Sequence, residues 1–480
     1  QMLFASIPFA CFFIVFFLLY WYVFGVSLKF QNLLILAGSY VFYAWWDWRF
    51  LFLLIFSSII SYFLGIGIGK TDNKKSRSLL VWTGLLQGLG CLVFFKYFNF
   101  LDVSMAGAFA LFNIKVNVVT LNIILPLGIS FYTFRIISYL LDIKNGKIQA
   151  TANLVTFCSY VAFFPSLIAG PIDRPKTLIP QLEKERVFDY NQAADGLRQI
   201  LWGLFKKIVI ADNCAAFTND VLNHYQTLPA SALLFSMALF TIQVYADFSG
   251  YSDMAIGLAS LLGFKITRNF NYPFFAQNIA DFWRRWHISL TSWLTDYVFT
   301  PLSVYFRDYG KYGLVLAILI NFTLIGIWHG ANWTFVFFGF LNGCLYIPLI
   351  IKGTLYKKKK GTQSGFKTFL NMAGMFILLM FTFLIFRADS LAQAFDYYRR
   401  LFSPSLFNSF VITEKVNMVA AILAIIVLFY AEWRQRDKEH ALQIDGIEKT
   451  GVRVVIYYGL VLFILVFSAT NITDFVYFKF

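Results

Sequence analysis

Charged residues are scarce in this 480-residue chain: Asp, Glu, Lys and Arg together make up 14% of it, against 59% for hydrophobic residues. Soluble globular domains contain roughly 25% charged and 45–50% apolar residues. No polar stretch between the apolar runs is long enough to bury a core of its own. The composition argues against a soluble domain and predicts one polytopic membrane domain that spans residues 1–480.

Cysteine is scarce as well, and it follows no metal-binding or redox pattern. The five cysteines stand singly, without CxxC pairs, and we interpret them as small core residues. No HExxH or GxSxG motif and no paired metal-ligand spacing occurs. The sequence therefore supports neither zinc nor serine hydrolysis, and we expect no bound metal or cofactor.

Long apolar runs are abundant. A membrane-spanning helix needs about 20 mostly apolar residues. Candidate runs lie near residues 3–26, 32–46, 50–69, 79–98, 119–141, 197–211, 232–251, 314–328, 335–351, 369–386, 416–433 and 454–468. These runs predict an all-α protein with about a dozen spans, some of them re-entrant.

The net charge of +15 is concentrated in loops. Basic residues follow Gly69, at positions 70–77, and Ile351, at positions 352–360. By the positive-inside rule both loops are predicted to be cytoplasmic, and three predicted spans before the first loop place the N-terminus outside the cytoplasm. Contact with anionic lipid explains the charge, and nothing in the pattern is typical of nucleic-acid binding.

Polar residues inside apolar segments are expected to be functional, because an ionisable group in the bilayer costs at least ~2.5–3.5 kcal/mol. The stretch QVYADFSGYSDMAIG (243–257) places Gln243 and Asp247 one helical turn apart, with Tyr245 between them. A polar cavity wall and a capped helix end explain this stretch equally well.

Two tryptophan–histidine dipeptides stand out. In NIADFWRRWHISLTSWL (278–294), His287 follows the cation pair Arg284 and Arg285, which would reach toward headgroups or an anionic ligand. In GIWHGANW (326–333), His329 ends an apolar run. A lone histidine on an apolar face is usually a core residue, yet two of only four histidines fall in such dipeptides.

A further stretch, FFPSLIAGPIDRP (163–175), carries three prolines and Gly170, which make a continuous span unfavourable. It is predicted to be a broken or re-entrant segment, which is tolerated only where it is buried in protein or lines a cavity. A histidine base without a nucleophile of its own is typical of a transferase that activates a substrate hydroxyl.

Five further stretches are YVFYAWWDWRF (40–50), LPLGISFYTFRIISYLLD (125–142), NFNYPFFAQ (269–277), FRADSLAQA (386–394) and FVYFKF (475–480). Taken in chain order with the stretches above, they resemble the membrane-bound O-acyltransferase family. Within it, they are most similar to the bacterial alginate O-acetyltransferase branch. The resemblance implies a ring of tilted helices around a central funnel. It also implies that His329 is the catalytic histidine and that His287 occupies the second conserved position.

The combined interpretation is an acyltransferase of the bacterial inner membrane. His329 would act as the general base, and donors for the oxyanion would come from His287, Asn332, Tyr245 or a backbone N–H. Trp328, Gln243, Asp247, Arg284 and Arg285 complete the expected substrate-binding set. Acetyl-CoA is the expected donor, and the acceptor is a glycan outside the cytoplasm, reached directly or through a partner acetyltransferase.

Three alternatives stay open from the sequence. D-alanyl transfer to teichoic acid and O-acetylation of peptidoglycan use related chemistry. A transporter would line a permeation path with the same polar residues, but it predicts inverted repeats, which are not seen.

Overall fold

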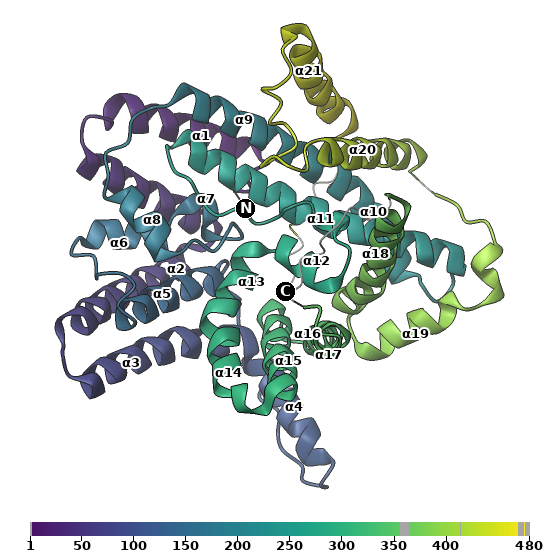
Figure 1. The fold of residues 1–480 in the computed structure, drawn as a ribbon, viewed down its shortest axis with the longest axis horizontal. Helices are drawn as coiled ribbons and strands as arrows, with labels where there is room; N and C mark the ends of the chain where they lie inside the picture. The colour runs from purple at the N-terminus through teal and green to yellow at the C-terminus, as the bar shows by residue number, and fades with distance from the viewer. Residues whose placement is uncertain (1, 356–364, 413, 469–474, 476–480) are drawn as a thin grey trace. The chain divides into compact units, whose positions relative to one another are not determined.

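The computed structural model describes residues 2–355, 365–412, 414–468 and 475. The lysine run 357–360 and most of the tail 475–480 lie outside the described residues. The described part is built from helices, shown in Figure 1, and it falls into two compact units. The first unit comprises residues 1–197 and 255–267, and the second comprises residues 198–254 and 268–480.

The first unit contains the N-terminal helices. They are α1 (Ile7–Leu18), η1 (Leu19–Val23), α2 (Leu28–Lys70), α3 (Lys74–Leu92), η2 (Val93–Tyr97), α4 (Phe98–Ala110), α5 (Ile129–Lys144), α6 (Leu154–Val161), α7 (Phe164–Leu167) and α8 (Pro175–Leu182). Helices α2, α3 and α5 pack on one another (Figure 1). The boundary between the units falls within α9 (Tyr190–Leu204) and again within α11 (Ala230–Leu261).

The second unit holds the remaining helices. They are η3 (Phe205–Ala211), α10 (Asp212–Asn223), η4 (Pro273–Phe275), α12 (Ile279–Arg285), α13 (Ile288–Leu294), η5 (Thr295–Phe299), α14 (Thr300–Tyr305), η6 (Arg307–Tyr309), α15 (Gly310–His329), α16 (Trp333–Cys344), α17 (Ile347–Ile351), α18 (Gly365–Arg387), α19 (Leu391–Leu401), η7 (Pro404–Phe407), α20 (Lys415–Arg434) and α21 (Thr450–Phe467). Helices α15 and α16 pack closely, and α16 also packs on α18.

Eight helices in the described residues are long and apolar enough to cross a membrane, which confirms an all-α polytopic membrane protein. Two predicted runs, 32–46 and 50–69, form one helix, α2, which is kinked at Asp47. At 1.5 Å per residue, its two parts are about 29 and 35 Å long, so each could still cross a hydrocarbon core of about 30 Å. The kink coincides with an ion pair between Asp47 and Arg49.

The predicted helix over 119–141 is wrong in its first part, because helix α5 begins only at Ile129. Residues 114–126 are extended or irregular. The Asn99 side chain replaces helical hydrogen bonding there: its amide donates to the carbonyl oxygen of Leu121 at 2.8 Å, and its oxygen accepts from the Leu121 N–H at 3.0 Å. Pro126 and Gly128, the latter with φ of 71°, then set the start of α5.

The broken segment predicted at 163–175 is present and is organised around Arg135 of α5. Its guanidinium is fully buried and donates to the carbonyl oxygens of Val161 at 3.1 Å and Ser166 at 3.0 Å. The carboxylate of Asp173 lies 3.6 Å away and accepts a hydrogen bond from the Ser166 hydroxyl. The free carbonyls of an interrupted helix thus find a cation as their partner.

Replacing Arg135 with Met should destabilise the protein strongly, because the change leaves the Asp173 carboxylate buried without its counter-ion and several carbonyls buried without their donor. Breaking a buried ion pair typically costs about 3–5 kcal/mol. The measurement is thermal unfolding in detergent. Arg49→Met is the matched control, because it removes an arginine from an exposed ion pair. Equal melting temperatures for the two variants would contradict the role given to Arg135.

Candidate active site

Both histidines of the tryptophan–histidine dipeptides are buried in the second unit, and both contact the Trp328 ring. The His287 and Trp328 ring centroids are 5.6 Å apart and nearly perpendicular, at 82°. The Trp328 and His329 centroids are 5.0 Å apart, at 74°. The fold therefore brings together two histidines 42 residues apart in the sequence, His287 with 0% of its surface exposed and His329 with 4%.

His329 is the last residue of α15, at the apex of a helical hairpin. Gly330 is extended, and the Asn332 side chain caps α16 by accepting from the Thr334 N–H at 3.0 Å. Close packing below the apex depends on glycine: a Cβ at Gly326 would lie 2.1 Å from the backbone oxygen of Phe335. The short connection and this close approach hold His329 in place. Its ring also packs on Phe386 at 5.2 Å.

His287 occupies an unusual backbone position. It is the N-cap of α13, with φ of 46° and ψ of 51°, in the left-handed region that non-glycine residues rarely adopt. Burial lowers the pKa of its imidazole from 6.5 to about 3, so the ring is neutral at physiological pH. Strain of this kind clusters at functional sites.

The predicted residues of α11 lie in a buried polar cluster. Gln243 accepts from the Thr218 hydroxyl at 2.6 Å, and Tyr245 donates to Glu432 at 2.7 Å. Asp247 pairs with Lys207 at 2.8 Å. These bonds join α11 to α10, η3 and α20. They favour a structural role for the three side chains, although Phe248 of the same helix packs on the His287 ring at 4.7 Å.

The other predicted residues are placed as follows. Asn332 donates to the backbone oxygen of Asp389 at 2.9 Å, so both ends of its amide are engaged in the hairpin. Arg285 pairs with Asp281 at 3.0 Å, four residues before it. Arg284 is exposed and lines a pocket. Of the two arginines, Arg284 is therefore the one available to a ligand.

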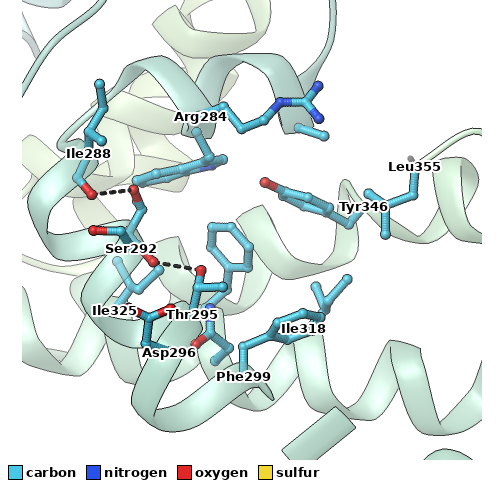
Figure 2. A pocket seen from close by; sticks show the side chains of 15 residues that line it. Arg284, Ile288, Ser292, Thr295, Asp296, Phe299, Ile318, Ile325, Tyr346 and Leu355 are labelled. Atoms are coloured by element: carbon cyan, nitrogen blue, oxygen red, sulfur yellow. Dashed lines mark hydrogen bonds between the residues drawn. The ribbon is translucent and has the colours of Figure 1, made fainter. Parts of the chain in front are cut away.

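A pocket lined by α13 and α15, which we call the α13–α15 pocket, has a volume of about 360 Å³ (Figure 2), and neither histidine is among its lining residues. It is lined by Ala280, Trp283, Arg284, Ile288, Thr291, Ser292, Thr295, Asp296, Phe299, Ile318, Asn321, Phe322, Ile325, Tyr346 and Leu355. Ile288 is the neighbour of His287, and Ile325 lies one turn before His329 on α15. Figure 2 shows the Tyr346 hydroxyl pointing into this space.

Sequence reasoning missed Asn321, which is 6% exposed and lines the pocket. Its side-chain oxygen has no hydrogen-bond partner among the described residues. A buried amide oxygen without a partner is costly, so a ligand that donates a hydrogen bond there would be stabilised. The signal was available, because Asn321 is a polar residue inside the apolar run 314–328.

Sequence reasoning also missed Asn269 and Asn342. Asn342 accepts from the indole N–H of Trp283 at 3.2 Å and so fixes one wall of the pocket. Asn269 bonds the two residues that follow His287, as described below. Asn342 carried the same signal as Asn321, because it lies inside the apolar run 335–351. Asn269 lies outside the predicted runs and acts through contacts with segments distant in the sequence.

The model of the membrane-bound O-acyltransferase family matches residues 42–388. The chain is 38% identical over 412 residues to the probable alginate O-acetylase AlgI of Azotobacter vinelandii. The aligned region covers 84% of this chain and 78% of that protein. It is 34% identical to the Pseudomonas putida protein of the same name over the full length of both. The peptidoglycan O-acetyltransferase of Helicobacter pylori is 35% identical, over 65% of this chain and 63% of its own length.

This chain belongs to the membrane-bound O-acyltransferase family, and it is a multi-pass membrane O-acyltransferase. An acyl donor and a glycan acceptor are implied by the relatives.

If His329 is the general base, His329→Gln should fold normally but lose roughly 10²–10⁴-fold in rate, because an amide fills the space without accepting a proton at neutral pH. The measurement is the rate of acyl transfer by purified protein in detergent. His224→Gln is the matched control, since His224 is exposed and bonded to Asp220. Near wild-type activity of His329→Gln would remove His329 from the mechanism.

Proposed function

We propose that the protein transfers an acetyl group from cytoplasmic acetyl-CoA to hydroxyls of a polysaccharide outside the cytoplasm, either directly or through a partner acetyltransferase. The observation that carries the proposal is the pair of buried histidines on Trp328. The α13–α15 pocket, of about 360 Å³, is lined in part by Ile288, the residue that follows His287. The acetylases among the relatives support the choice of acetyl group and glycan.

The chemistry requires one base and one hydrogen-bond donor. His329 takes the proton of the acceptor hydroxyl while the hydroxyl oxygen attacks the thioester carbonyl carbon. The carbonyl oxygen becomes an oxyanion, which a neighbouring donor stabilises. The C–S bond then breaks, and the proton held by His329 passes to the leaving thiolate. The net result is an ester and a free thiol, with no proton gained or lost.

The α13–α15 pocket suits the donor. Leu355, which lines it, belongs to the basic loop 352–360 that is predicted to be cytoplasmic. The exposed Arg284 is placed to hold a phosphate, and Asn321 offers a buried acceptor to an amide N–H of the pantetheine arm. Lys206 and Lys207 are not placed for this role, because both are buried in ion pairs, with Asp253, Asp212 and Asp247.

D-alanyl transfer to teichoic acid is less well supported. The teichoic acid D-alanyltransferase of Bacillus subtilis is 28% identical over 55% of this chain, whereas alginate O-acetylases align over most or all of it. O-acetylation of peptidoglycan is consistent with the same chemistry and differs only in the acceptor.

Membrane vesicles can test the proposed direction and acyl group together. Inverted vesicles, whose cytoplasmic face is outward, should transfer label from added [¹⁴C]acetyl-CoA to enclosed glycan, and mild base should release it as acetate. Right-side-out vesicles should stay unlabelled, because acetyl-CoA does not cross the bilayer. Labelling of right-side-out vesicles would contradict the predicted sidedness. Transfer of label from a D-alanyl carrier protein, and not from acetyl-CoA, would favour D-alanyl transfer.

The donor pocket predicts a change in KM for acetyl-CoA. Arg284→Glu and Asn321→Leu should each raise this KM several-fold and leave the KM for the acceptor unchanged, because each removes a contact to the donor alone. Arg307→Glu is the control, as Arg307 is 75% exposed and does not line the pocket. An unchanged donor KM in both folded variants would assign Arg284 to lipid headgroups and the pocket to another use.

A further inference from the structure

The backbone that directly follows His287 is fixed by Asn269, which is completely buried. The backbone oxygen of Asn269 accepts from the N–H of Ile288 at 2.8 Å. Its side-chain oxygen accepts from the N–H and the hydroxyl of Ser289 at 3.3 and 2.9 Å. These bonds fix the first residues of α13 and hold His287 in its left-handed conformation.

The Asn269 side chain is itself fixed from a third segment. Its amide donates to the Ser252 hydroxyl of α11 at 3.1 Å. Ser252 is 1% exposed, so the bond is shielded from water. Asn269 therefore links α11 to the start of α13 and contributes both a backbone and a side-chain bond to that link.

The ring of His287 is oriented by the helix that it caps. Its Nδ1 accepts a hydrogen bond from the N–H of Leu290 at 3.3 Å, and this N–H also lies 3.0 Å from the backbone oxygen of His287. Only an unprotonated ring nitrogen can accept from an N–H. In a neutral imidazole the hydrogen then resides on Nε2.

We propose that Asn269 and the first turn of α13 hold His287 as a permanent Nε2–H donor, which stabilises the oxyanion while His329 carries the proton. This inference rests on the proposed function and adds a division of roles between the two histidines. Asn269 is a positioning residue that acts through His287. Because Nδ1 is occupied by the helix, His287 donates one hydrogen bond and takes no proton during the reaction.

The tautomer can be observed directly. With [¹⁵N]histidine and only four histidines in the chain, single His→Gln variants assign each ring. The His287 spectrum should show a hydrogen on Nε2 and none on Nδ1. This spectrum should not change between pH 5.5 and 8, because burial keeps the pKa of His287 near 3. A hydrogen on Nδ1, or titration in this range, would overturn the inference whatever the enzyme transfers.

A substitution series at position 287 separates hydrogen-bond donation from capping. Asn and Asp both cap helices and both tolerate left-handed backbone, but only Asn carries an N–H. We expect His287→Asn to retain kcat within about 10-fold, and His287→Asp and His287→Ala to lose roughly 10²–10³-fold, the usual effect of removing one oxyanion donor. Equal rates for the Asn and Asp variants would show that only the cap matters and would overturn the donor role.

The role of Asn269 is tested by a double-mutant cycle. Asn269→Leu should lower kcat about 10-fold or more with little change in KM, yet have almost no further effect in the His287→Ala background. Additive losses would contradict a role exerted through His287. Ser252→Ala is a milder change that should show the same non-additivity if Asn269→Leu does not fold.

Asn32→Leu is the matched control for the loss of a buried asparagine. Asn32 lies in the first unit, is 5% exposed, and bonds Leu182 and Arg186. The Asn32→Leu substitution should lower the melting temperature without lowering kcat. If His287→Ala were fully active, the inference would fail, whereas the proposed function would still be judged by His329→Gln and by the vesicle assay.

Discussion

A polar group buried in a membrane protein must find its partner within the protein, and most of this structure can be understood from that constraint. The carbonyls of Val161 and Ser166, before and within the broken segment 163–175, are bonded to Arg135. Lys207 lies between the carboxylates of Asp212 and Asp247, at 2.9 and 2.8 Å. Asn321 is one of several exceptions among the described residues, and its buried oxygen, which lacks a partner there, lines a pocket.

The same constraint acts differently on the two histidines. Both contact the indole of Trp328, but their surroundings differ. The Nδ1 atom of His287 is bonded to the backbone of α13, so its protonation is set by secondary structure. His329 ends a helix and is packed among aromatic rings, including Phe338 and Phe386. The hydrogen bonding of the His287 imidazole is thus fixed by the fold.

Hydrophobicity and proline placement were enough to predict the helical class, most spans and the broken segment. The choice of His287 and His329 as site residues also came from the sequence, through the two dipeptides and the family resemblance. What the sequence could not supply depends on distant contacts: the left-handed backbone of His287 requires Asn269, and the irregular stretch before α5 requires Asn99. Gln243 and Asp247 do share a helix, but their partners on α10 and η3 could not be inferred from spacing.

The environment of Arg135 has a consequence for the order in which the chain is assembled. Arg135 is made before every group that satisfies it: its carbonyl partners at Tyr160 and Ser166 follow 25 and 31 residues later. While the chain is being synthesised, α5 therefore presents an uncompensated guanidinium until these residues have left the ribosome. The bonding of Arg135 can consequently be completed only after residue 166 has been made, so a single side chain sets a minimum length of chain for this part of the fold.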